Sequence, residues 1–113
     1  MHEMSVAIGI MKVLAAKLKE EAPCKLISAE LAVGELSGID RDSLRFALDT
    51  LLDEAGYKDV QMRFEQVPAA FKCNNCGWGG RLKNYALVCP GCKGIDLDII
   101  SGQDVYLERI EVE

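Results

Sequence analysis

Cys73-Asn74-Asn75-Cys76-Gly77 and Cys89-Pro90-Gly91-Cys92 are two C-x-x-C pairs with twelve residues between them. Each pair can bind one ion from a tight turn, and two such turns complete a tetrahedron of thiolates around Zn²⁺. The spacing therefore predicts a zinc ribbon held by Cys73, Cys76, Cys89 and Cys92. Since four thiolates leave no open position for water or substrate, we expect the zinc to be structural rather than catalytic.

The segment around these cysteines has little apolar sequence, so we expect the metal to fold it. Some hydrophobic cover is available between the pairs, from Trp78, Leu82, Tyr85, Leu87 and Val88. Glycines lie where the backbone must turn sharply round the ion, at Gly77, Gly91 and Gly94.

The chain has five cysteines, and the fifth, Cys24, stands far from the others after Pro23. In a reducing cytosol, an odd count with two close pairs indicates metal binding rather than a disulfide framework. A redox-active C-x-x-C pair is the alternative, but such pairs normally begin a helix in a larger fold. We interpret Cys24 as a plain thiol near a turn.

Two segments before the cysteines have helical periodicity. The apolar spacing from Ser5 to Ala22 matches one helix face, with Ser5 as a possible N-cap and Pro23 as the stop. A second helix is predicted from Asp40 to Ala55, with Gly56 as the left-handed residue after its end. The expected buried positions are Ala7, Ile10, Met11, Leu14, Leu18, Leu44, Leu48, Leu51, Leu52 and Ala55.

Three segments alternate with the period of two that is typical of strands. From Lys25 to Gly34 we expect a half-buried strand, and a second strand follows around Val60 to Glu65. The last segment, Asp104 to Glu113, is predicted to place Tyr106, Ile110 and Val112 on one face.

This order of elements predicts an α+β fold, a three-stranded sheet with two helices plus an inserted four-cysteine zinc-ribbon lobe. The last strand should return to the sheet of the first two. We therefore expect one domain made of residues 1–68 and 98–113, and a zinc-ribbon domain at 69–97.

Composition narrows the function classes. The formal net charge is −5, but residues 71–95 carry +4 and no acid, which leaves −9 on the rest. A zinc-ribbon adaptor that binds nucleic acid through the basic charges Lys72, Arg81, Lys83 and Lys93 is thus one hypothesis. The acidic remainder and the few aromatic residues, Phe71, Trp78 and Tyr85, argue against it.

An enzyme is a weaker hypothesis. The chain has a single histidine, no phosphate-cradling glycine motif and no open metal site in the predicted ribbon. Its apolar runs are shorter than the ~20 residues of a membrane span, and the start has no pattern of a secretion signal. We expect a cytoplasmic protein without a membrane partner.

The single histidine is His2, within Met1-His2-Glu3. On chemistry alone a frayed tail is the simpler interpretation. The alternative is a metal site, because a free α-amine, the next backbone amide nitrogen and the imidazole can surround an ion in a square plane. That geometry suits Ni²⁺ or Cu²⁺ better than Zn²⁺, and Glu3 adds a carboxylate.

The start Met-His-Glu-Met-Ser, the helix behind it and the late ribbon before a final strand resemble the HypA/HybF family, nickel metallochaperones of [NiFe]-hydrogenase maturation. The resemblance covers essentially the whole chain. The matching pieces are Met1 to Val6, Val33 to Ser37, Leu44 to Leu48, both cysteine pairs, and Ser101-Gly102.

The resemblance implies a transient Ni²⁺ site at His2, with the Met1 amine and nearby backbone amides as co-ligands and Glu3 tuning the site. Asp40 could lie close by, although we favour a helix N-cap for it. The implied partners are a hydrogenase maturation GTPase and the [NiFe]-hydrogenase large subunit, and for some members urease maturation proteins. Zinc would remain structural.

Overall fold

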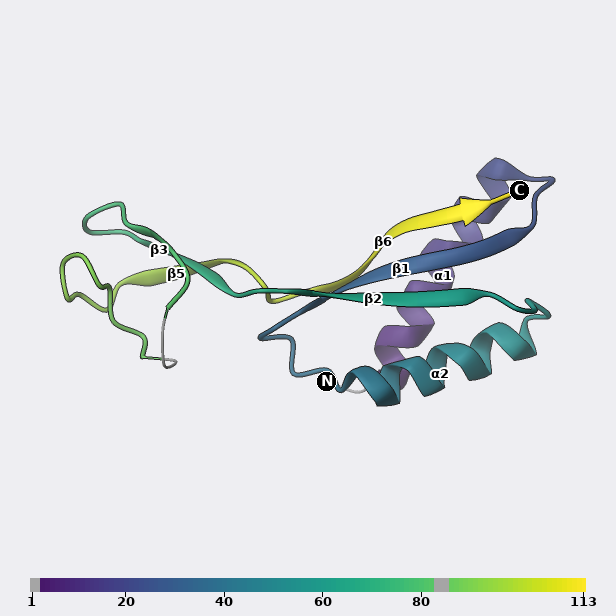
Figure 1. Cartoon of the computed structure of the whole chain (residues 1–113), viewed down its shortest axis with the longest axis horizontal. Coiled ribbons are helices and arrows are strands. Elements are labelled where there is room, and N and C mark those ends of the chain that lie inside the picture. The colour runs from purple at the N-terminus through teal and green to yellow at the C-terminus, as the bar shows by residue number, and fades with distance from the viewer. Residues whose placement is uncertain (1–2, 83–85) are drawn as a thin grey trace.

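The computed structural model of the chain describes residues 3–82 and 86–113. Two three-stranded sheets follow one another along a molecule with extents of 54 × 25 × 18 Å (Figure 1). The elements are α1 (Glu3–Glu21), β1 (Leu26–Gly34), α2 (Arg41–Glu54), β2 (Gln61–Val67), β3 (Ala70–Cys73), β4 (Gly79–Gly80), β5 (Leu97–Ser101) and β6 (Val105–Val112). The predicted α+β class is confirmed, and the inserted lobe has a small sheet of its own.

The first sheet has the strand order β2-β1-β6. β1 runs parallel to β2, and α2 supplies the crossover that a parallel pair needs. β6 is antiparallel to β1, so the last strand returns to the first sheet as predicted. We call this sheet with α1 and α2 the helical lobe. The second sheet, β4-β3-β5, and the four cysteines of the two C-x-x-C pairs form the cysteine lobe.

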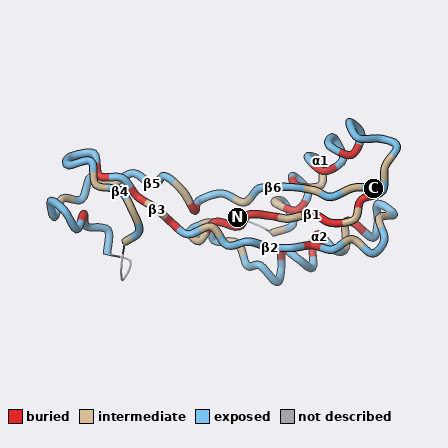
Figure 2. The backbone as a smooth tube through the Cα atoms, turned by 45° about the horizontal axis from the view of Figure 1, so that its top comes forward, coloured by how far each residue is buried: buried red, intermediate tan, exposed pale blue. Residues whose placement is uncertain are grey.

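Both helices cover one face of the first sheet, and the main core lies between them (Figure 1). In Figure 2 the buried positions follow β1 and recur along the helices. The buried side chains are Ala7, Ile10, Leu14, Leu18, Leu26, Ala29, Leu31, Val33, Leu44, Ala47, Leu48, Leu52 and Met62. The predicted helix faces are therefore largely confirmed, with Met11 and Leu51 at the margin of the core and Ala55 exposed. A fully buried leucine contributes about 2 kcal/mol to such a core.

β1 is more deeply buried than the predicted half-buried strand. It is the central strand, and Ala32, on the face away from the helices, is 0% exposed. Ala32 pairs with Glu65 on one side and Tyr106 on the other. These larger neighbours cover the small side chain, so position in the sheet overrides the simple alternation.

The prediction that Tyr106 shares one face of β6 with Ile110 and Val112 is wrong, because Tyr106 is 48% exposed. Val105 and Leu107 pack on the core instead, together with Ile110 and Val112. The pairing shifts between Glu30 and Leu31, so one extra β6 residue is inserted as a β-bulge. A bulge reverses the phase of alternation along a strand. The core-facing residues of β6 are therefore odd-numbered before the bulge and even-numbered after it.

The helix ends agree with most of the predicted signals. α1 stops at Glu21, before Pro23, but it begins at Glu3, so Ser5 lies inside the helix and is not the predicted cap. Gly56 follows α2 with φ +87°, the left-handed conformation that was predicted. Within residues 3–82 and 86–113, neither helix has the length and apolar character needed to cross a membrane.

Candidate metal centre

The four cysteines of the two pairs converge in the cysteine lobe. Their sulfur atoms all lie within 4.8 Å of one another. The Sγ atoms of Cys73 and Cys92 are 3.6 Å apart, and those of Cys76 and Cys89 are 3.5 Å apart. A disulfide would need about 2.05 Å, whereas thiolates around one Zn²⁺ with bonds of about 2.3 Å stand about 3.8 Å apart. Four sulfur ligands in this arrangement fit a structural metal site and are compatible with zinc.

The first knuckle of this site is closed by two backbone hydrogen bonds. The Cys73 N–H donates to the carbonyl of Trp78 at 2.7 Å, and the Gly77 N–H donates to the carbonyl of Cys73 at 3.1 Å. Gly77 has φ +80°, the left-handed conformation expected there. The turn thus brings Cys73 and Cys76 to the same point.

The second knuckle repeats these bonds with different residues. Cys89 N–H donates to Gly94 O at 2.8 Å, and Lys93 N–H donates to Cys89 O at 2.9 Å. The residue with left-handed backbone in this turn is Lys93, with φ +65°. Space is tight at Gly94, where a Cβ would lie 3.2 Å from Cys92 Sγ, whereas a Cβ on Gly91 would only reach van der Waals contact with Cys76 Sγ at 3.4 Å.

Backbone amides favour a thiolate at Cys89. The N–H groups of Cys92 and Gly91 point at its Sγ, at 3.5 and 3.3 Å, and lower the pKa of Cys89 to about 7. At Cys76 the Trp78 amide acts in the same direction, but the neighbouring thiols and desolvation outweigh it and raise the pKa to about 11. Thiols this close resist ionising together, which is the condition that a bound cation relieves.

Hydrophobic cover over the centre is thin. Trp78 and Leu82 are half-buried, Leu87 and Val88 are exposed, and Tyr85 lies outside the described residues. The predicted cover is therefore wrong for Leu87 and Val88. Phe71, on β3, is buried instead. With so little apolar packing, a metal bound by the four cysteines would be the main source of stability for the cysteine lobe.

Three of the four predicted basic charges fall within the described residues. Lys72, Arg81 and Lys93 are exposed, and Lys83 lies outside the described ranges. Arg81 pairs with Glu35 of the helical lobe at 3.3 Å. One of the basic side chains thus forms an ion pair within the molecule, although it remains exposed.

The predicted nickel ligands Met1 and His2 lie outside the described residues. Glu3, the third, begins α1, and its Oε2 accepts a hydrogen bond from the Asp40 N–H at 3.2 Å. Asp40 occupies the N-cap position of α2 as predicted, but its side chain forms no capping bond. Glu3 and Asp40 are therefore brought together at the start of both helices.

The Asp40 carboxylate is engaged by Ser43, whose hydroxyl donates to Oδ2 at 2.6 Å. This bond lowers the pKa of Asp40 below its ordinary value. The group therefore favours folding above the pKa of the unfolded chain, and this contribution is lost as pH falls through the lower, folded pKa.

Replacing Ser43 by Ala should raise the pKa of Asp40 toward its ordinary value, because the charged form loses its principal donor. Carboxyl ¹³C NMR titration measures this directly. Thr50→Ala is a matched control, since its hydroxyl donates to the Phe46 carbonyl on the same helix. An unchanged Asp40 pKa in Ser43→Ala would contradict the assigned cause.

A second acidic group lies on the face of the first sheet away from the helices. Carboxylate oxygens of Glu30, Glu65 and Glu108 lie within 4.8 Å of one another. Arg109 Nε is 3.5 Å from Glu30 and already offsets part of this charge. Because exposed acidic groups are common without a metal, we assign no site there.

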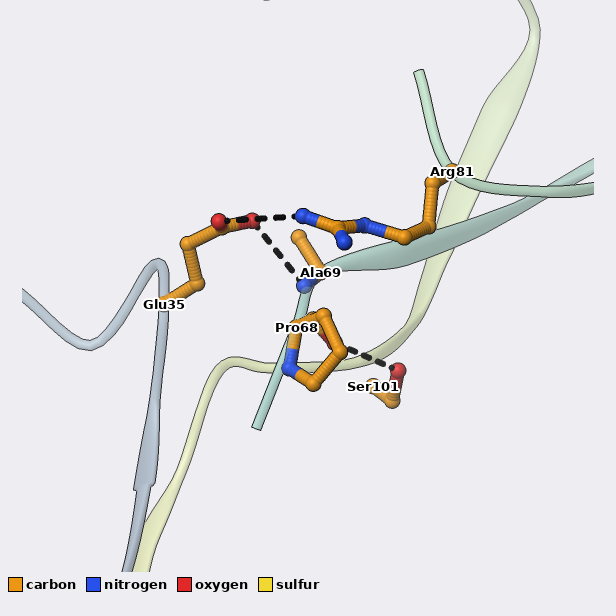
Figure 3. A network of polar contacts seen from close by, with 5 residues as sticks. All are labelled: Glu35, Pro68, Ala69, Arg81 and Ser101. Atoms are coloured by element: carbon orange, nitrogen blue, oxygen red, sulfur yellow. Dashed lines mark hydrogen bonds and ion pairs between the residues drawn. The ribbon is translucent and has the colours of Figure 1, made fainter. Parts of the chain in front are cut away.

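Sequence reasoning did not single out the contacts of Glu35. Its carboxylate accepts a hydrogen bond from Ala69 N–H at 3.1 Å and pairs with Arg81 (Figure 3). These partners are 34 and 46 positions away. No local pattern signals contacts at such separations, and only the charge of Glu35 beside a turn could have drawn attention to it.

Comparisons with known proteins agree along the whole chain. A family model described as "Hydrogenase/urease nickel incorporation, metallochaperone, hypA" matches residues 1–112. The "Hydrogenase maturation factor HypA" of Dehalococcoides mccartyi strain 195 is 34% identical over 113 residues, covering 100% of this chain and 95% of that protein. The protein of the same name from Caldanaerobacter subterraneus subsp. tengcongensis is 33% identical over 114 residues, and the match covers 100% of both.

Solved structures show the same fold. The solution structure of the Ni metallochaperone HypA from Helicobacter pylori matches with a TM-score of 0.76 at 22% identity, over 98% of this chain and 97% of that one. A second HypA solution structure gives 0.78 at 21% identity, over 99% and 96%. With the family model and the curated relatives, the four-sulfur centre and the two-lobed fold identify the chain as a member of the HypA family of nickel metallochaperones for hydrogenase maturation.

Proposed function

We propose that this protein binds Ni²⁺ at its N-terminus and helps deliver it to the [NiFe]-hydrogenase large subunit during maturation. The observation that carries this proposal is the family match, which begins at residue 1 and so includes Met1-His2-Glu3. A zinc ion held by Cys73, Cys76, Cys89 and Cys92 would serve the fold alone, since four sulfur ligands leave it no open position.

In this proposal the nickel ligands are the Met1 amine, the adjoining backbone amide nitrogen and the His2 imidazole. Together they offer the square-planar nitrogen set that suits Ni²⁺. The Asp40 amide holds the Glu3 carboxylate at the start of α2, where Asp40 adds a second negative charge. Both charges favour a cation nearby. Because the amine, amide and imidazole must lose protons to bind, nickel affinity should fall as pH drops.

We further propose a nickel-binding unit made of residues 1–68 and 98–113 and a zinc-ribbon unit at 69–97. The two separate sheets support such a division, although β5 pairs with β3 and reaches past the boundary at 97. The partners would be a maturation GTPase and the hydrogenase large subunit, and in some members of this family also urease maturation proteins. The protein would act by contact and transfer, without catalysing a reaction.

Calorimetric titration of untagged, zinc-loaded protein with Ni²⁺ tests the proposal. We expect about one ion per chain, and at least a tenfold loss of affinity in His2→Ala, equivalent to about 1.4 kcal/mol. Glu3→Gln should weaken binding less. Glu21→Gln, an exposed change at the other end of α1, is its matched control and should leave nickel binding unchanged.

A short extension before Met1 separates the amine from the imidazole as ligands. It converts the amine into an amide, so the extended protein should lose nickel binding while it keeps His2. Equal binding in extended and untagged protein would show that the amine is no ligand. No nickel binding in either would remove the delivery role and leave the zinc-ribbon adaptor as the working hypothesis.

A further inference from the structure

The helical and cysteine lobes meet where three segments of the chain cross. Backbone hydrogen bonds hold the end of β1 and the residue after it. Gly34 N–H donates to Asp104 O at 2.8 Å, and Glu35 N–H donates to Val67 O at 2.9 Å. Leu36 N–H donates to Gly102 O at 2.7 Å. The turn after β1 is therefore tied to both connections between the lobes, one from β2 to β3 and one from β5 to β6.

One side chain from this turn extends the contact to the cysteine lobe. Glu35 Oε1 accepts the hydrogen bond from Ala69 N–H, and Oε2 faces Arg81 Nη2 at 3.3 Å (Figure 3). Ala69 precedes β3, and Arg81 follows β4. The two oxygens of a single carboxylate thus bind a connecting segment and the cysteine lobe itself.

The two bonds differ in strength. The Glu35 side chain is 23% exposed, whereas Arg81 is 64% exposed. Exposed ion pairs contribute little, because water and salt screen them. The bond from the Ala69 N–H is the stronger of the two, since its acceptor is charged and the bond is partly buried. Most of the restraint should therefore come from Glu35 and Ala69.

Beside these bonds the surface is hollowed. Glu35 and Leu36 line an open groove of about 300 Å³ with Ala69, Phe71, Leu82, Leu87 and Ile99. Leu36, Leu87 and Ile99 are exposed, so this side of the junction is open to water rather than closed by apolar packing. On this side the hydrogen bonds of Glu35 are therefore the contacts that restrain the cysteine lobe.

We propose that Glu35 is a latch that fixes the orientation of the cysteine lobe on the helical lobe. When the carboxylate is released, the cysteine lobe turns about the two connecting segments, residues 67–70 and 101–105. The backbone bonds of Gly34 and Leu36 keep the segments together, so release changes orientation and leaves each lobe folded. This is a hinge closed by one side chain.

The latch sits at one end of a short loop whose other end is Asp40. The Asp40 N–H holds Glu3, so a single loop, residues 35–40, joins the latch to the start of α1. The latch therefore sets the position of the cysteine lobe relative to that end of the helical lobe. The proposal rests on these contacts alone and holds whether or not nickel binds there.

Residual dipolar couplings of ¹⁵N-labelled, zinc-loaded full-length protein test the latch. In the unmodified protein, both lobes should fit one alignment tensor. Glu35→Ala should abolish the shared tensor, so that each lobe requires its own. Glu35→Gln retains an acceptor for Ala69 and should be intermediate, and Arg81→Ala should produce the smallest change.

Asp53→Ala is the matched control, because it removes an exposed carboxylate paired with Lys58 at 2.9 Å inside one lobe. It should keep the shared tensor. A single tensor in Glu35→Ala would overturn the proposal. So would loss of zinc or of the cysteine-lobe signals in both Glu35→Ala and Glu35→Gln, because Glu35 would then be required for folding rather than for orientation.

Discussion

Replacing Cys89 by Ser should unfold the cysteine lobe and leave the helical lobe folded. Cys89 is 0% exposed and its Sγ lies 3.5 Å from that of Cys76, so the serine hydroxyl would stand in the centre of the cluster without the charge of a thiolate. Structural zinc contributes about 10–16 kcal/mol to the folding of such lobes. Losing one of four ligands should remove several kcal/mol of this, more than a lobe with little apolar core can supply.

Zinc content and amide NMR spectra measure the outcome together. We expect the Cys89→Ser protein to lose bound zinc and the dispersed signals of β3 and β5, while those of β1 persist. Cys24→Ser is the matched control, since Cys24 is half-buried in the helical lobe and remote from the cluster. Full zinc occupancy in Cys89→Ser would contradict a site built from four thiolates.

The helical lobe should survive because the two lobes have separate sources of stability. The buried cluster of the helical lobe draws its members from α1, α2, β1 and β2, with partly buried side chains from β6 packed against it. Phe71 and the two buried cysteines lie apart from that cluster. A defect at the metal therefore removes no contact from the main core, and chelation of zinc should have the same selective effect.

Local signals account for what the sequence predicts correctly. The spacing of two C-x-x-C pairs specifies a four-sulfur site because each pair closes its own turn. The apolar stripes of α1 and α2 follow from helix geometry alone, and Leu14 and Leu48 are buried as expected. Both kinds of pattern depend on residues close together in the chain.

The errors arise where distant segments decide the conformation. The strict alternation predicted for β6 placed Tyr106 inward, but a bulge opposite β1 reverses the phase. In the second knuckle Lys93 adopts the left-handed conformation, which the glycines nearby in the sequence do not indicate. The latch formed by Glu35 depends on contacts with Ala69 and Arg81, and no periodicity in the sequence predicts these contacts.

Gly34→Ala should strongly destabilise the protein. A Cβ on Gly34 would lie 2.3 Å from Gly102 O and 2.9 Å from Asp104 O. Both atoms belong to the backbone, so no side chain can rotate away, and the crossing segments must separate. We expect a loss on the order of 3 kcal/mol in the free energy of unfolding, measured by urea denaturation. Gly9→Ala, at an open position of α1, is the control and should stabilise by about 0.5–1 kcal/mol.

The pattern of damage distinguishes this variant from loss of a metal ligand. Gly102 has φ +88° and its own Cβ position is blocked by Ala69, so it cannot yield to a methyl group on Gly34. Separating these segments disturbs β1, the central strand of the helical lobe, and the connections to the cysteine lobe together. Amide signals of both lobes should therefore weaken in Gly34→Ala, whereas Cys89→Ser affects one lobe. Damage confined to the cysteine lobe would show that the crossing belongs to that lobe alone.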